Sequence, residues 1–123
     1  MAWEMKTDRP IYIQIVEKLK NRIVSGYYPP GEKIPSVREL ASEAGVNPNT
    51  MQKALGDLER QGLLHTQRTN GKTVTDEEDK ILAMREGMAE EETGIYFEKM
   101  RSLGYVPSKT REFVDRMAAR LEA

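Results

Sequence analysis

Two helix-start signals on either side of one glycine constrain this chain more than any other feature. Ser36 and Glu39 have the spacing of a capping box, in which each residue accepts a hydrogen bond from the other's backbone amide. A short helix should follow and end at Gly45. Asn47 and Pro48 then supply an N-cap and a proline suited to the first helical position. Two short helices joined by so tight a turn are the helix-turn-helix pattern.

A longer helix is predicted before this pair, and the second helix of the pair has a clear inner face. Isoleucine or leucine recurs every four residues from Ile11 to Ile23, so the spacing predicts a helix from Pro10 to Gly26. The last of the three helices should end at Gly62. It should bury the stripe Met51, Ala54, Leu55 and Leu58.

The residues after Gly62 have the composition of a β-hairpin. Residues 63–67 and 72–75 are strand-like, and Thr69, Asn70 and Gly71 lie between them. An Asn-Gly pair between two such runs is a strong hairpin signal, because both residues adopt positive φ readily. A hairpin directly after a helix-turn-helix is a wing. Residues 1–75 are therefore predicted to form a winged helix-turn-helix domain.

The composition changes at residue 76 and predicts a helical tail over residues 76–123. Its first apolar residues fall on a broken helical stripe, interrupted by Gly87, Gly94 and the acidic residues 90–92. Gly104 and Pro107 should end this segment, and Ser108 should cap a last helix. The predicted fold class is mainly α with a small β-hairpin. We expect the tail to dimerise through Ile81, Met84, Met88, Ile95, Met100, Leu103, Phe113 and Met117.

The composition argues against several classes of protein. The sequence has no cysteine and one histidine, so we expect no disulfide framework, no metal site and no Ser-His triad. We find no nucleophile-base pair and no phosphate-cradling loop, so we expect neither an enzyme nor a cofactor. No apolar run approaches the ~20 residues of a membrane span, and the N-terminus has no secretory core. A reducing cytoplasm is the expected location.

Charge is distributed unevenly along the chain, although the net charge is only −1. Residues 1–75 carry 11 Lys and Arg against 8 Asp and Glu, whereas residues 76–123 carry 8 against 12. A basic first part suits the approach to phosphates, and an acidic tail does not.

Residues 90–92 could suggest a cation site with Glu86. Consecutive acids point in different directions around a helix, however, so a solvated, DNA-repelling face is the preferred interpretation.

Several motifs follow one another in unbroken order over residues 9–75: Pro10-Ile11-Tyr12-x-Gln14-Ile15, Pro30-Gly31-Glu32-Lys33-Ile34-Pro35-Ser36-Val37-Arg38-Glu39-Leu40-Ala41, Gly45-Val46-Asn47-Pro48-Asn49-Thr50 and Ala54-Leu55-x-x-Leu58-Glu59-x-x-Gly62-Leu63-Leu64. Together they closely resemble the GntR family. The short tail is similar to that of the YtrA subfamily, whose two C-terminal helices serve in dimerisation. The resemblance implies a transcriptional regulator, often a repressor. Many family members have arginine at the positions of Pro48 and Gln52, so the resemblance transfers no base preference.

Nine polar residues of the predicted domain are candidates for contact with DNA: Ser36, Arg38, Asn47, Asn49, Thr50, Gln52, Lys53, Arg68 and Lys72. Arg38 lies in a first helical turn, where the helix dipole disfavours a cation, which favours contact with phosphate or a base. The alternative is a surface arginine paired with Glu39 or Glu43. Ser36 has a complete role as a cap, and it also lies at an exposed helix N-terminus suited to phosphate.

The remaining candidates lie on the predicted recognition helix and on the wing. Asn and Gln side chains can pair bidentately with adenine, and Thr can contact a thymine methyl. The alternative for residues 49–53 is an ordinary polar helix face, and for Asn47 a cap. Arg68 and Lys72 bracket the wing tip, where a cation can reach the minor groove or its phosphates. The alternative for both is a solvated hairpin charge.

These observations predict a sequence-specific transcriptional repressor that binds a palindromic operator in double-stranded DNA as a homodimer. The alternative is a winged-helix module for protein or RNA binding. A tail over residues 76–123 is too short to build both a core and a pocket. An unidentified small-molecule effector would therefore bind between subunits or between head and tail.

Overall fold

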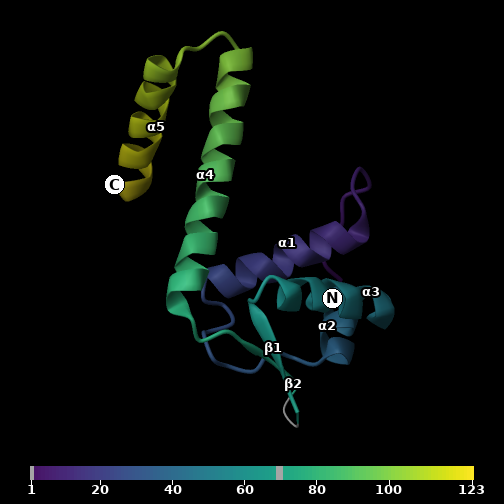
Figure 1. Cartoon of the computed structure of the whole chain (residues 1–123). Helices are drawn as coiled ribbons and strands as arrows, with labels where there is room; N and C mark the ends of the chain where they lie inside the picture. The colour runs from purple at the N-terminus through teal and green to yellow at the C-terminus, as the bar shows by residue number, and fades with distance from the viewer. Residues whose placement is uncertain (1, 69–70) are drawn as a thin grey trace. The chain divides into compact units, whose positions relative to one another are not determined.

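The computed structural model describes residues 2–68 and 71–123, which form five α-helices and one two-stranded hairpin (Figure 1). In chain order the elements are α1 (Ile11–Val24), α2 (Val37–Ala44), α3 (Pro48–Arg60), β1 (Leu64–Gln67), β2 (Gly71–Val74), α4 (Glu78–Ser102) and α5 (Pro107–Glu122). This order confirms the predicted fold class, a winged helix-turn-helix followed by a helical tail. The chain divides into two compact units, Met1–Arg85 and Glu86–Ala123. Helix α4 begins in the first unit and continues into the second.

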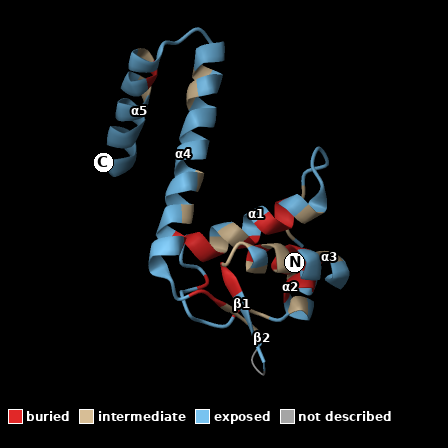
Figure 2. Cartoon of the chain, viewed as in Figure 1, coloured by how far each residue is buried: buried red, intermediate tan, exposed pale blue. Residues whose placement is uncertain are grey.

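The core of the first unit is formed by α1, α2, α3 and the hairpin (Figure 2). The predicted inner face of α3 is confirmed, because all four residues of its stripe are buried. The stripe of α1 begins at Ile15, one turn later than the spacing suggests, since Ile11 is 48% exposed. The large apolar side chains of the first unit that are almost fully buried are Ile15, Leu19, Ile23, Leu40, Met51, Leu55, Leu58, Leu63, Leu64 and Val74.

The turn between α2 and α3 has the predicted construction. Helix α2 ends at Gly45, whose φ of 75° lies in the left-handed region that glycine adopts without steric cost. Asn47 is the N-cap of α3, and Pro48 occupies its first turn. The sequence therefore correctly predicts the end of α2 and the start of α3.

The wing is braced by the loop that precedes α2. Strands β1 and β2 pair antiparallel, from Leu64 opposite Val74 to Gln67 opposite Gly71. The amide of Ile34 donates to the carbonyl of Lys72 at 3.0 Å, so the loop before α2 runs along β2. The predicted Asn-Gly turn involves Thr69 and Asn70, which lie outside the described residues.

The tail differs from its prediction at one point, the N-cap of its last helix. Helix α4 is continuous through Gly87 and Gly94, the two glycines that interrupt its apolar stripe. The last helix has Val106 as its N-cap and Pro107 at its first position, so the prediction that Ser108 caps it is wrong. Proline suits the first helical position because its missing N–H needs no partner there. None of the described helices is long and apolar enough to cross a membrane.

Candidate nucleic-acid interface

The N-terminus of α2 presents Ser36 and Arg38 to solvent. The Ser36 hydroxyl accepts from the Glu39 amide at 3.1 Å, and the Glu39 carboxylate accepts from the Ser36 amide at 2.9 Å. These hydrogen bonds hold the pKa of the Glu39 carboxyl below its usual range. Glu39 is thus occupied by the cap, and Glu43 pairs with Arg22. Neither of these two acids, which were the alternative surface partners for Arg38, forms an ion pair with the Arg38 guanidinium.

The first turns of α3 carry the predicted base-contacting residues. Asn49, Gln52 and Lys53 are exposed, and Thr50 is half-buried. Asn47 has the capping role, because its Oδ1 accepts from the Asn49 amide at 2.7 Å. The first turn and a half of a recognition helix is the part that meets base edges, and in α3 this part is polar and largely exposed.

One surface depression of about 390 Å³ joins α2, α3 and the wing. It is lined by residues of all three elements and of the loop before α2: Pro35, Ser36, Val37, Arg38, Gln52, Leu55, Thr66, Gly71 and Lys72. Four of the nine predicted contact residues, Ser36, Arg38, Gln52 and Lys72, therefore share one face of the first unit. Their sequence separation is up to 36 positions, so only folding brings them together.

The two wing cations differ in their surroundings. Arg68 is exposed. Lys72 is turned toward α3, where its Nζ lies 2.5 Å from Glu59 Oε1 and 3.0 Å from the Thr66 hydroxyl. The hydrogen bonds from Lys72 and Thr66 hold the pKa of the Glu59 carboxyl below its usual range. The charge of Lys72 is therefore already compensated within the protein, unlike that of an exposed hairpin lysine.

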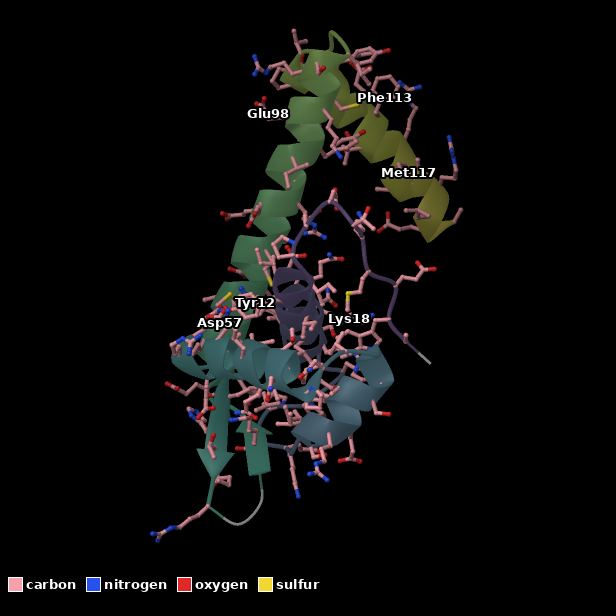
Figure 3. The ribbon with its side chains drawn as sticks, turned by 90° about the vertical axis from the view of Figure 1, so that its right-hand side faces the viewer. Tyr12, Lys18, Asp57, Glu98, Phe113 and Met117 are labelled. Atoms are coloured by element: carbon pink, nitrogen blue, oxygen red, sulfur yellow. The ribbon has the colours of Figure 1, made fainter. Side chains whose placement is uncertain are left out.

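A hydrogen bond between residues 45 positions apart, which no local sequence pattern indicates, fixes α3 on α1. The Tyr12 hydroxyl donates to Asp57 Oδ2 at 2.6 Å, and both residues are labelled in Figure 3. This hydrogen bond is the main reason that the pKa of the Asp57 carboxyl is lowered. The Lys53 ammonium lies 4.7 Å from the centre of the Tyr12 ring, within the range of a cation–π interaction. Tyr12 thus holds one candidate DNA-contacting residue in place.

The residues before α1, 2–10, form an N-terminal arm that contacts the C-terminal end of α2. The Trp3 indole N–H donates to Glu43 Oε2 at 2.8 Å, and the Trp3 amide donates to the Ala44 carbonyl at 3.2 Å. The Arg22 guanidinium lies 4.9 Å from the centre of the Trp3 ring. No local sequence pattern indicates these contacts, because Trp3 and Glu43 are 40 residues apart.

The residues predicted for dimerisation fall into two groups. Ile81 is 6% exposed and belongs to the core of the first unit, so it is not available on the surface. The others are exposed or half-buried, with exposures of 44% for Ile95, 72% for Leu103 and 49% for Met117. Within residues 86–123, all of which are described, Thr110 alone is buried. The second unit therefore leaves much of its apolar surface uncovered.

Comparison with known proteins identifies the family to which the first unit belongs. The family described as "Bacterial regulatory proteins, gntR family" matches residues 11–74, which span α1 to the end of the wing. The chain belongs to the gntR family of bacterial regulatory proteins. The resemblance inferred from the sequence is confirmed, and this gntR-family chain is a DNA-binding transcriptional regulator.

Three similar proteins match different shares of this chain. The HTH-type transcriptional repressor YtrA of Bacillus subtilis is 42% identical over 71 residues, which cover 58% of this chain and 55% of YtrA. A GntR family transcriptional regulator from Listeria monocytogenes superposes with a TM-score of 0.84 at 35% identity, covering 91% of this chain and 98% of that one. The DNA-binding domain of AraR in complex with operator ORX1 superposes with a TM-score of 0.53 at 34% identity, covering 61% and 93%.

Proposed function

We propose that this gntR-family regulator is a repressor that binds a two-fold symmetric operator as a homodimer. The N-terminus of α2, the first turns of α3 and the wing would form the DNA-binding face. The observation that carries this proposal is the shared depression, which brings Arg38, Gln52 and the wing onto one face of the first unit. The structural likeness to the DNA-binding domain of AraR, which was solved in complex with an operator, supports this choice of DNA-binding face.

Each part of this face suits a different component of DNA. Arg38 and the exposed start of α2 suit a phosphate or a guanine, because a guanidinium binds either bidentately. Asn49 and Gln52 on α3 suit adenine in the major groove. Arg68 on the wing suits the minor groove or its flanking phosphates. We assign Lys72 a smaller role, because Glu59 already compensates its charge.

The second unit supports the homodimer. Residues 86–123 form part of α4 and all of α5 and bury one residue, so they cannot stabilise themselves by an internal core. Their exposed apolar residues would be covered by the same surface of a second copy. An isologous dimer presents two equal recognition helices and would require a palindromic operator.

The test compares Arg38→Ala with Arg111→Ala, which removes the same charge from the exposed surface of α5. The operator is first selected by the wild-type protein from a pool of random DNA duplexes. Arg38→Ala should lose about 1–3 kcal/mol of binding free energy to that operator, and Arg111→Ala should bind as the wild type does.

Three outcomes would contradict the proposal. Equal affinities of the two variants, with folds intact by circular dichroism, would exclude Arg38 from the DNA-binding face. A selected duplex without two-fold symmetry, bound by one protomer, would exclude the dimeric mode of binding. Failure to select any duplex, with retained capture of RNA or of a protein, would favour the alternative interaction module.

A further inference from the structure

The second unit contains an apolar groove between its two helices. Its walls are formed by Tyr96 of α4 and by Phe113, Val114, Met117 and Leu121 of α5, and its volume is about 640 Å³. Figure 3 labels Phe113 and Met117 on α5. Met117 is 49% exposed and Leu121 is 77% exposed. A groove with such walls would gain stability from an apolar occupant.

One edge of this groove is basic. Arg116 and Arg120 line it and are four residues apart, which places them on the same side of α5. The Arg116 guanidinium lies 4.9 Å from the centre of the Phe113 ring, so it flanks the apolar wall. The occupant of the groove should therefore combine apolar side chains with carboxylates.

Helix α4 presents a surface with those properties. Met88 and Ile95 are seven residues apart, and Glu91 and Glu92 lie between them at spacings of three and four residues, so all four share one side of the helix. Residues 86–98 contain five glutamates and no lysine or arginine. The acidic residues 90–92 thus lie beside apolar residues on a stretch of α4, residues 86–98, that contains no lysine or arginine.

We propose that the α4 surface of one protomer occupies the α4–α5 groove of the other, with Glu91 and Glu92 pairing with Arg116 and Arg120 across the interface. The groove and its complement lie on the same chain, so a two-fold axis forms every contact twice. This inference rests on the homodimer proposed above and specifies its partner surfaces. Ion pairs at the edge of an apolar contact would set the register of the two helices.

The test is a pair of charge reversals. In variant one, Arg116→Glu and Arg120→Glu make the groove acidic, and in variant two, Glu91→Arg and Glu92→Arg make the α4 surface basic. Each variant alone brings like charges together, so its dimer should weaken by about tenfold or more. A 1:1 mixture restores opposite charges at both contacts, so it should form heterodimers. Native mass spectrometry distinguishes the species.

Matched controls reverse neighbouring charges outside the proposed contact. Glu90→Arg lies on another side of α4 and Arg111→Glu on another side of α5, so both should dimerise as the wild type does. Circular dichroism shows whether α4 and α5 remain helical. Higher salt should reduce the defect of each reversed variant alone, because it screens like charges.

The outcomes separate this inference from the proposed function. A wild-type protein that is monomeric would contradict the homodimer itself. A dimeric wild type with reversed variants that dimerise equally well would overturn the pairing and leave the homodimer intact. Helical reversed variants that stay monomeric when mixed would also overturn it, because opposite charges would then fail to restore the contact.

Discussion

The Arg22 guanidinium donates a hydrogen bond of 2.6 Å to the Glu43 carboxylate and ties α1 to the last turn of α2. Trp3 donates to the same carboxylate oxygen, so the acid joins three segments of the first unit. The opposite end of α2 is held by the capping box and by the loop that pairs with β2. The helix that carries Arg38 is thus fixed at both ends.

The Glu43 contact should make the stability of the first unit depend on pH. The hydrogen bond from Arg22 lowers the pKa of Glu43 below its ordinary value of 4.5. A lowered native-state pKa contributes stability above the unfolded-state pKa and loses it as pH falls through the native-state pKa. The side chain of Glu43 is 40% exposed, so solvent screening should limit the contribution to about 1 kcal/mol or less.

Glu43→Gln should therefore be less stable than the wild type at pH 7, and the difference should shrink as pH falls below about 4.5. Urea unfolding at several pH values measures this difference in the free energy of unfolding. Glu122→Gln, at the exposed end of α5, serves as the control. A difference between Glu43→Gln and the wild type that persists unchanged at acid pH would show that the carboxylate charge is not involved.

Trp3 offers a second test of the N-terminal arm. Trp3→Phe keeps an aromatic ring beside Arg22 but removes the N–H that donates to Glu43, so it should cost about 1 kcal/mol. Trp3→Ala also removes the ring and should cost about 0.5–1 kcal/mol more. Thermal unfolding compares the three proteins. Equal stabilities would mean that the arm does not brace α2.

Gly45 should tolerate alanine less well than Gly26 does. Both have positive φ, so each alanine substitution should cost about 1–2 kcal/mol of backbone strain. A Cβ on Gly45 would also lie 2.7 Å from the Ala2 Cβ, whereas a Cβ on Gly26 meets nothing within 4 Å. Gly45→Ala should therefore destabilise the protein more, as measured by urea unfolding.

A double-mutant cycle isolates the contact with the arm. Ala2→Gly removes the clashing methyl group, so in that background Gly45→Ala should cost no more than Gly26→Ala does. If Gly45→Ala still destabilises the protein more than Gly26→Ala does in the Ala2→Gly background, the extra loss of stability arises in the turn and not from the contact with Ala2.

The two wing cations should contribute differently to DNA binding. Arg68→Ala should reduce the slope of log K against log salt by about one unit, because it removes an exposed cation. Lys72→Ala should change the slope less, because Glu59 already compensates the lysine charge. Titration against the selected operator at several salt concentrations measures both slopes. A larger change for Lys72→Ala would mean that the lysine leaves Glu59 on binding.

The helix boundaries of the first unit could be predicted because their causes are local. The capping box at Ser36, the left-handed glycine at 45 and the cap at Asn47 each act over four residues or fewer. Hydrogen bonds of such short reach appear in the sequence as spacings. Ser108 shows the limit of this reasoning, because the neighbouring Pro107 took the first helical position and left Val106 as the cap.

The amino-acid sequence by itself therefore determined the helices, the wing strands and the family resemblance, all of which depend on residues close together in the chain. The tertiary structure alone decided that Lys72 pairs with Glu59, that Tyr12 binds Asp57 across 45 positions, and that Ile81 is buried in the first unit. The physical reason is that a side chain's charge, exposure and partners depend on which distant segments pack against it. No periodicity within one segment contains that information.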